Sequence, residues 1–308
     1  MKKAKRAVVI GDVFVDMISE IEGFPERGGR TYGVPFGRSE GGTAGNIAAG
    51  LSALGMDTAI IAGIGEDESG EFLLKGLEQI GVDVSWIRPK SGLHSGTTAI
   101  FTDLQGERDI YMLVRGSAFE KLETEDFACL EEIQPDILCL TGVLAGICPA
   151  QEAVVEAARK WKGKAELYFD PNLCYPADKV PPKVKEGACQ IADLCDVVLT
   201  GETEMKALGL TPKEGQSYVI KCGGQGSRLM NDRQEIVFQI PATRHRPVDT
   251  TGAGDTYMAA FVAARAQGKT MEDAMKYASV AAGISVTKKG ARNMPSLSEI
   301  EKGIEEYK

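Results

Sequence analysis

The sequence predicts an α/β fold in which a mostly parallel central sheet is flanked by helices. Short β-rich apolar runs recur along the chain, and longer segments with helical apolar spacing lie between several of them. Buried strands that alternate with helices form parallel sheets with right-handed crossovers. The 308 residues can bury a large core and no linker divides them, so we expect one α/β domain over residues 1–308.

Six short apolar runs, rich in β-branched or aromatic residues, are predicted as buried strands: Val8–Ile10, Thr58–Ala62, Asp136–Leu140, Glu166–Phe169, Asp196–Leu199 and Tyr218–Lys221. Four segments are predicted as helices from their apolar spacing: Ala44–Leu54, Gly70–Ile80, Ala150–Trp161 and Thr203–Leu208. A further helix is expected after Gly254, because the apolar positions from Tyr257 onward keep helical spacing up to Gly268, a plausible C-terminal stop.

Two segments interrupt this alternation, at residues 17–38 and 97–115. The first is rich in Gly and Pro, and the second contains two strand-like runs around the turn Gln105–Arg108, which predicts a hairpin. We expect these segments to form a small β lid that excludes water from an active site. Surface excursions without a function are the alternative.

The composition is that of an ordinary globular protein. Hydrophobic residues make up 43% of the chain and the formal net charge is −9, which argues against nucleic-acid or anionic-membrane partners. No apolar run approaches the roughly 18 residues that a membrane helix needs, and the basic start precedes a short strand-like run instead of a signal-peptide core. The seven cysteines contain no C-x-x-C pair. We therefore expect reduced thiols and a cytoplasmic protein.

The segment Val248–Thr256, with the sequence VDTTGAGDT, is the most informative part of the chain. Gly252, Ala253 and Gly254 stand where the next helix is expected to begin, so little side chain blocks their N–H groups. Open amides at the positive end of a helix dipole attract anions. Asp255 at the same place could take a proton from an attacking hydroxyl, which suits phosphoryl transfer. A glycine-rich turn that only caps the helix is the alternative.

A second glycine-rich segment, GGTAGNIA at 41–48, also precedes a predicted helix. Gly41 and Gly42 would let a ligand approach the backbone, and Asn46 offers both a donor and an acceptor to hydroxyl groups. Two glycines before a helix are a weak signal alone, but the pairing with the first motif makes it strong.

Together the two motifs resemble the signatures of the ribokinase-like (PfkB) carbohydrate kinases. DTTGAGDT at 249–256 resembles the C-terminal signature and G-G-x-x-x-N-x-A at 41–48 the N-terminal one. The resemblance covers roughly residues 7–305 and implies a ribokinase-like fold with ATP-dependent phosphorylation of an alcohol on a small sugar. It implies that Asp255 is the general base, while the Gly252–Gly254 amides stabilise the transferring phosphoryl group.

Other segments extend the resemblance to substrate and nucleotide. GDVFVD at 11–16 resembles the end of the family's first strand, where acidic groups bind sugar hydroxyls. KCGGQG at 221–226 resembles its glycine-rich turn on the nucleotide side. The resemblance thus implies an acceptor site formed by Asp12, Asp16, Gly41, Gly42 and Asn46. It implies an ATP site that includes Lys221, Gly224, Gly226 and Gly254.

The metal-related motifs depart from the family pattern. GETE at 201–204 resembles the N-x-x-E motif that places magnesium, but Gly201 replaces the Asn and only Glu204 remains. One carboxylate and waters can still hold Mg²⁺ through its water shell, so magnesium dependence is expected. DPN at 170–172 resembles the D-x-N strand end, with Cys174 where the family usually has Arg. Segment 285–291 resembles the family segment that flanks the adenine and a monovalent-cation site, so the resemblance implies that Asp249 and this segment could hold a cation such as potassium.

The acceptor is less clearly specified. FPERGG at 24–29 resembles the turn of the ribokinase lid, and together with Asp16 it favours a neutral sugar such as ribose or fructose. Residues 110–118 and 140–143 instead resemble 2-keto-3-deoxygluconate kinases, in which an arginine such as Arg115 could clamp a carboxylate. Nucleoside kinases share the fold, and a non-catalytic ligand-binding protein is a more distant alternative. By analogy, two copies would pair through their lids.

Overall fold

The computed structural model describes residues 5–173 and 175–307, so Cys174 lies outside the described residues. Its central sheet has eight strands: β1 (Arg6–Gly11), β4 (Asp57–Ala62), β7 (Ile137–Thr141), β8 (Glu166–Asp170), β9 (Val197–Gly201), β10 (Ser217–Lys221), β11 (Ser227–Met230) and β12 (Ile236–Ile240). They follow the order β12-β11-β10-β9-β8-β7-β1-β4, in which β10 to β4 run parallel and β11 and β12 form an antiparallel edge. The predicted mostly parallel sheet is therefore confirmed.

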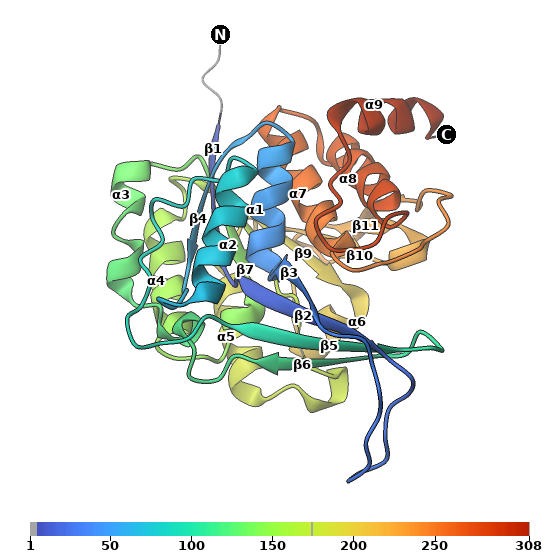
Figure 1. Cartoon of the computed structure of the whole chain (residues 1–308). Helices are drawn as coiled ribbons and strands as arrows, with labels where there is room; N and C mark the ends of the chain where they lie inside the picture. Colours follow the sequence, from blue (N-terminus) through green and yellow to red (C-terminus); the bar gives the residue numbers. More distant parts are fainter. Residues whose placement is uncertain (1–4, 174, 308) are drawn as a thin grey trace.

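Helices cover both faces of this sheet (Figure 1). The described α-helices are α1 (Thr43–Ala53), α2 (Glu68–Gln79), α3 (Leu130–Ile133), α4 (Ala150–Trp161), α5 (Pro182–Ala192), α6 (Glu202–Leu208), α7 (Ala253–Ala266), α8 (Met271–Ser285) and α9 (Leu297–Glu306). Helices α1, α2, α7, α8 and α9 contribute to one core, and α3 to α6 to the other. None of these described helices is both long and apolar enough to span a bilayer.

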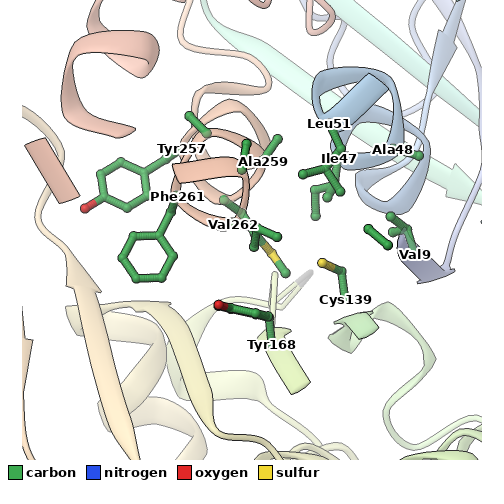
Figure 2. Close-up of a cluster of buried hydrophobic side chains, with 14 of the residues drawn as sticks. Val9, Ile47, Ala48, Leu51, Cys139, Tyr168, Tyr257, Ala259, Phe261 and Val262 are labelled. Carbon is green, nitrogen blue, oxygen red and sulfur yellow. The ribbon is translucent and has the colours of Figure 1, made fainter. Parts of the chain in front are cut away.

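Strand β1 shows how the sheet divides the two cores. Its residues alternate, so Ala7 and Val9 pack with one cluster while Val8 and Ile10 pack with the other. A parallel strand buried on both faces needs such a continuous apolar run. Figure 2 shows the first cluster, in which Phe261 of α7 packs near the sheet. Phe261 is fully buried, and burial of a side chain of this size contributes about 1.5–3 kcal/mol to folding.

A second, smaller sheet lies across one end of the layers (Figure 1). Its four strands are β2 (Phe14–Ile21), β3 (Gly37–Gly41), β5 (Thr97–Asp103) and β6 (Arg108–Leu113). They follow the order β3-β2-β5-β6, in which β2 and β5 are parallel and the other pairs are antiparallel. Because β2 begins just after β1 ends, this sheet starts at the carboxyl edge of the central one.

Candidate active site

The candidate site lies where the parallel strands of the central sheet end. Asp12 follows β1, Asp170 ends β8 and Lys221 ends β10. Carboxyl ends of parallel strands share one edge of the sheet, which is where ligands bind in α/β folds. The first turns of α1 and α7 begin at the same edge and bring Asn46 and Asp255 into contact.

Asp255 is the third residue of α7 and is half-buried. Its Oδ2 accepts a hydrogen bond from Asn46 Nδ2 at 2.8 Å. Burial raises the pKa of Asp255 to about 7, and the nearby carboxylates of Asp170 and Asp12 act in the same direction against Asn46 and Lys221. A carboxylate with a pKa near neutral pH is well matched to general-base catalysis.

The loop that leads into α7 requires glycine at position 252. Gly252 has a φ of 72°, and a Cβ there would stand 2.3 Å from the Ala291 carbonyl oxygen. No side chain caps the N-terminus of α7. The positive end of a 14-residue helix therefore faces the site without a side-chain acceptor for its first amides.

Asp249 holds this loop in place. Its Oδ1 accepts from the Thr251 amide at 2.9 Å, and its Oδ2 accepts from the Gly290 amide at 2.9 Å. The carboxylate thus ties the start of the VDTTGAGDT segment to the loop after α8. Both oxygens of the residue predicted to bind a monovalent cation therefore have backbone partners.

Lys221 and Asp170 form an ion pair beside Asp255. Lys221 Nζ lies 2.5 Å from Asp170 Oδ2, and the Asp170 side chain is only 2% exposed. Burial raises the pKa of Asp170 despite the lysine. Burial also opposes the charge of Lys221, but the carboxylates of Asp170, Glu204 and Asp255 outweigh it and raise the lysine pKa. The pair places one positive charge next to the start of α7.

A cavity of about 290 Å³ opens on the α8 side of this loop. The four residues predicted to bind ATP, Lys221, Gly224, Gly226 and Gly254, all line it. Ala253 and Val286 add apolar surface, and such mixed walls are typical of small-molecule sites.

Asp16 of β2 is a second acidic group, which lies close enough to Asp12 and Arg292 to be influenced by their charges. Burial raises the pKa of Asp16 to about 6, while a Thr98 hydrogen bond and the charge of Arg292 oppose this shift. Gly41 is needed for this arrangement, because a Cβ at that position would stand 2.2 Å from Asp16 Oδ2. Gly42 has a φ of 86° and is the N-cap residue of α1.

Asp12 is buried, with only 2% of its surface exposed. Its Oδ2 accepts from the Thr43 amide at 2.7 Å and its Oδ1 accepts from the Thr141 hydroxyl at 3.0 Å. These bonds join the first turn of α1 to the end of β7. Both carboxylate oxygens therefore already have protein partners.

Glu204 is also engaged by the protein. Its Oε2 accepts from the Gly201 amide at 3.0 Å and from the Thr200 hydroxyl at 2.8 Å, and its Oε1 accepts from the Leu173 amide. The carboxylate thereby caps α6. Over residues 5–173 and 175–307 no group of three or more His, Cys, Asp or Glu side chains could hold a metal ion.

Arg115 stands apart from Asp255 and Asp16 in its contacts. It is exposed and lines a separate cavity of about 730 Å³ together with Met112, Asn172, Tyr175 and Lys183. Part of this cavity is therefore formed by β6 and its following loop.

The structure adds two arginines that the motifs do not indicate. Arg292 donates from Nε to Asn46 Oδ1 at 3.2 Å, and Arg108 on β6 donates from Nη1 to Thr251 Oγ1 at 2.8 Å. Neither arginine belongs to a recognisable motif or to a regular spacing of residues in the sequence. Only the charge of Arg292, set among small residues after the segment 285–291, could have drawn attention to it.

The fold and this site define a class of protein: an α/β phosphotransferase with a half-buried aspartate at a helix N-terminus, beside a glycine-lined cavity. The chain belongs to the pfkB family of carbohydrate kinases, whose model matches residues 4–298. It is therefore a carbohydrate kinase, which transfers a phosphoryl group to an alcohol.

Similar proteins agree over nearly the whole chain. A sugar kinase of Pyrococcus horikoshii is 29% identical over 302 residues, covering 95% of this chain and 94% of its own. Its crystal structure with ATP has a TM-score of 0.84 at 27% identity, covering 98% and 99% of the two chains. Ribokinase of Bacillus subtilis is 29% identical over 95% of this chain and 97% of its own. A 5-dehydro-2-deoxygluconokinase of the same organism is 28% identical over 88% of each.

Proposed function

We propose that this kinase uses Asp255 to deprotonate a sugar hydroxyl, which then attacks the γ-phosphorus of ATP. The supporting observation is the position of Asp255 between two sets of residues. Ala253 and Gly254 line the cavity on one side, and Asn46 contacts the carboxylate from the other. A base at this boundary stands where an acceptor hydroxyl and a terminal phosphate would meet.

In this proposal the transferring phosphoryl group lies against the N-terminus of α7. The amides of Gly252, Ala253 and Gly254 donate to its oxygens, and Lys221 adds a positive charge. A cavity lined by glycines suits the nucleotide because backbone can approach the phosphates closely. The sugar kinase of P. horikoshii with ATP supports this choice of nucleotide.

Magnesium fits the site through water and phosphate oxygens more than through protein ligands. Asp170 and Glu204 supply carboxylate charge, but Lys221, Gly201 and other groups already occupy their oxygens. Mg²⁺ commonly keeps several waters and binds nucleotide phosphates with one or two carboxylates nearby. When bound, it would neutralise charge on the phosphates. Its removal with EDTA should abolish turnover.

For the acceptor we propose a neutral furanose or ketose, held by Asp16, Asn46 and the backbone at Gly41 and Gly42. The Asp16 carboxylate accepts hydrogen bonds and the Asn46 amide can both donate and accept them, so these groups can bind sugar hydroxyls. Asp12 then contributes indirectly, because it accepts a hydrogen bond from the Thr43 amide and so holds the start of α1. The B. subtilis ribokinase supports this choice.

A sugar acid is the second candidate, because Arg115 and Lys183 line one cavity. Two cations there could bind a carboxylate. The 5-dehydro-2-deoxygluconokinase of B. subtilis supports this alternative.

The second sheet would act as the lid and as a dimer surface. Arg108 on β6 already reaches Thr251, which stands beside the proposed phosphoryl site. Tyr111 and Leu113 share one face of β6 and are 51% and 61% exposed, and pairing of two lids would bury such side chains. Analytical ultracentrifugation would test the dimer.

Two further features belong to this proposal. Potassium could bind beside Asp249 and the loop 285–291, because the Val286 carbonyl accepts from the Asp249 backbone amide and the Gly290 amide fixes the carboxylate. Comparing rates in KCl and in tetramethylammonium chloride would test it. A cytoplasmic location is favoured by the use of ATP and by the free cysteine thiols of the described chain.

The first experiment is ADP release from Mg-ATP with ribose, fructose, 2-keto-3-deoxygluconate and several nucleosides. Turnover with one neutral sugar supports the first acceptor, and turnover with the acid supports the second. Asp255→Asn should lower turnover by about 10³-fold or more while ATP binding is kept. Near-normal turnover in this variant would remove Asp255 from the proposed role.

A further inference from the structure

Arg292 lies in the loop between α8 and α9, half-buried against the start of α1. Its Nη2 is buried without a hydrogen-bond partner among the described residues. Gly45 leaves room for it, since a Cβ at that position would stand 2.9 Å from Nη2. The guanidinium is thus seated in a space that α1 leaves open, at the cost of burying a polar group.

The hydrogen bonds of Asn46 connect this arginine to Asp255. Arg292 Nε donates to Asn46 Oδ1 at 3.2 Å, and Asn46 Nδ2 donates to Asp255 Oδ2 at 2.8 Å. An asparagine amide has one end that accepts and one that donates, whereas a guanidinium can only donate. With Arg292 in place, only one orientation of the Asn46 amide satisfies both neighbours.

We propose that Arg292 is a positioning residue for phosphoryl transfer, which holds the Asn46 amide in the orientation that donates to Asp255. A donated hydrogen bond stabilises the ionised carboxylate, which is the form that can accept a proton. Without Arg292 the amide could turn its oxygen toward Asp255 and stabilise the protonated acid instead. This inference rests on the proposed role of Asp255 as the base.

Other charges face the same groups and must be separated from this effect. Three charged groups at the ends of strands influence Asp255: Asp12 just after β1, Asp170 at the end of β8 and Lys221 at the end of β10. Arg292 is itself faced by Glu40 on β3 and Asp16 on β2. The largest charge effects on Asp255 come from Asp170, Lys221 and Asp12, and not from Arg292. An effect of Arg292 on Asp255 should therefore pass through Asn46.

The direct test is a pH titration of Asp255 by NMR in protein labelled with ¹³C at aspartate carboxyl carbons, with Asp255→Asn to assign the resonance. Arg292→Met should raise the pKa of Asp255 by about one unit. The same change in an Asn46→Ala background should produce no further rise. An unmoved pKa in Arg292→Met, or an equal rise in both backgrounds, would overturn the proposal.

Controls separate positioning from folding. Arg159→Met removes an exposed arginine from α4 and should leave the titration and the melting temperature unchanged. If Arg292→Met does not fold, Arg292→Lys keeps the charge but lacks the planar fork, and should raise the pKa of Asp255 by a smaller amount. An unchanged pKa in the lysine variant then counts against the proposal.

Turnover with the acceptor identified by ADP release gives the second measurement. The acid limb of the kcat/KM–pH profile, which reports the free enzyme, should move upward by about one unit in Arg292→Met, so that kcat/KM falls about fivefold at pH 7 and recovers near pH 9. A loss that is equal at every pH indicates a merely structural role. Full activity of Asp255→Asn would instead refute the proposed base, whatever the Arg292 titration shows.

Discussion

Asn46 and Asp255 lie 209 positions apart in the sequence, and Asn46 Nδ2 donates to Asp255 Oδ2 at 2.8 Å. The bond joins the first turn of α1 to the first turn of α7, so the two glycine-rich motifs form one site. Both helices pack in the same core, where Ile47 and Leu51 of α1 face α7 (Figure 2). Changes in either motif should therefore affect the other.

The raised pKa of Asp255 should make protein stability depend on pH. A carboxyl group whose pKa rises from 3.8 to about 7 on folding stabilises the fold when protonated, and this contribution is lost as the pH rises from about 4 to about 7. Asp255→Asn removes the charge, so it should melt higher than the wild type above pH 7 and differ less at pH 5. Thermal melts across pH 5–8.5 test this. Equal differences at all pH values would contradict it.

Gly41→Ala should impair binding of the acceptor. Its Cβ would stand 2.2 Å from Asp16 Oδ2, so the carboxylate must move. Because a displacement of about 1 Å can cost up to about 10²-fold, we expect the acceptor KM to rise at least tenfold while the KM for ATP is kept. Gly37→Ala is a matched control on the same strand, since its nearest contact is the Ile18 carbonyl oxygen at 3.9 Å. Equal kinetics in the two variants would argue against a role for Asp16.

Gly252→Ala and Gly254→Ala should separate loop geometry from anion binding. At position 252 the φ of 72° and the Ala291 oxygen at 2.3 Å both oppose a side chain, so we expect a loss of about 2 kcal/mol or more in unfolding free energy. At position 254 a Cβ would meet only Lys221 Nζ at 3.5 Å, so stability should be kept while ATP affinity falls. Chemical denaturation and calorimetric ATP titration measure the two effects. A stable Gly252→Ala variant would show that the loop can relax.

Lys221→Met should lower both stability and turnover. It leaves the buried Asp170 carboxylate without its partner, and breaking such a pair costs about 3–5 kcal/mol, with the lower value expected because 20% of the lysine side chain is exposed. In Asp170→Asn/Lys221→Met the unpaired charge is gone, so stability should largely return while turnover stays low. Recovery of turnover in the double variant would mean that Lys221 acts only on folding.

Much of the fold could be predicted from local pattern alone. Apolar runs such as Asp136–Leu140 coincide with strands because a parallel strand buried on both faces needs continuous apolar sequence. The sequence does not predict the antiparallel edge of the sheet. Strand β11 has only four residues and the outer strand β12 has largely exposed positions, so neither shows a clear alternation of apolar and polar residues. In the predicted lid segment 17–38, β2 extends to Ile21 and β3 begins at Gly37, and residues 22–36 connect them.

The sequence by itself determined the class of this protein, because glycine-rich turns before helices and a carboxylate at a helix start are encoded within a few neighbouring residues. The tertiary structure alone decided what Asp12, Glu204 and Arg292 do. Asp12 and Glu204 have oxygens filled by backbone amides from distant segments, and Arg292 reaches Asn46 across 246 positions. Such partners depend on how whole elements pack, and no local spacing records them.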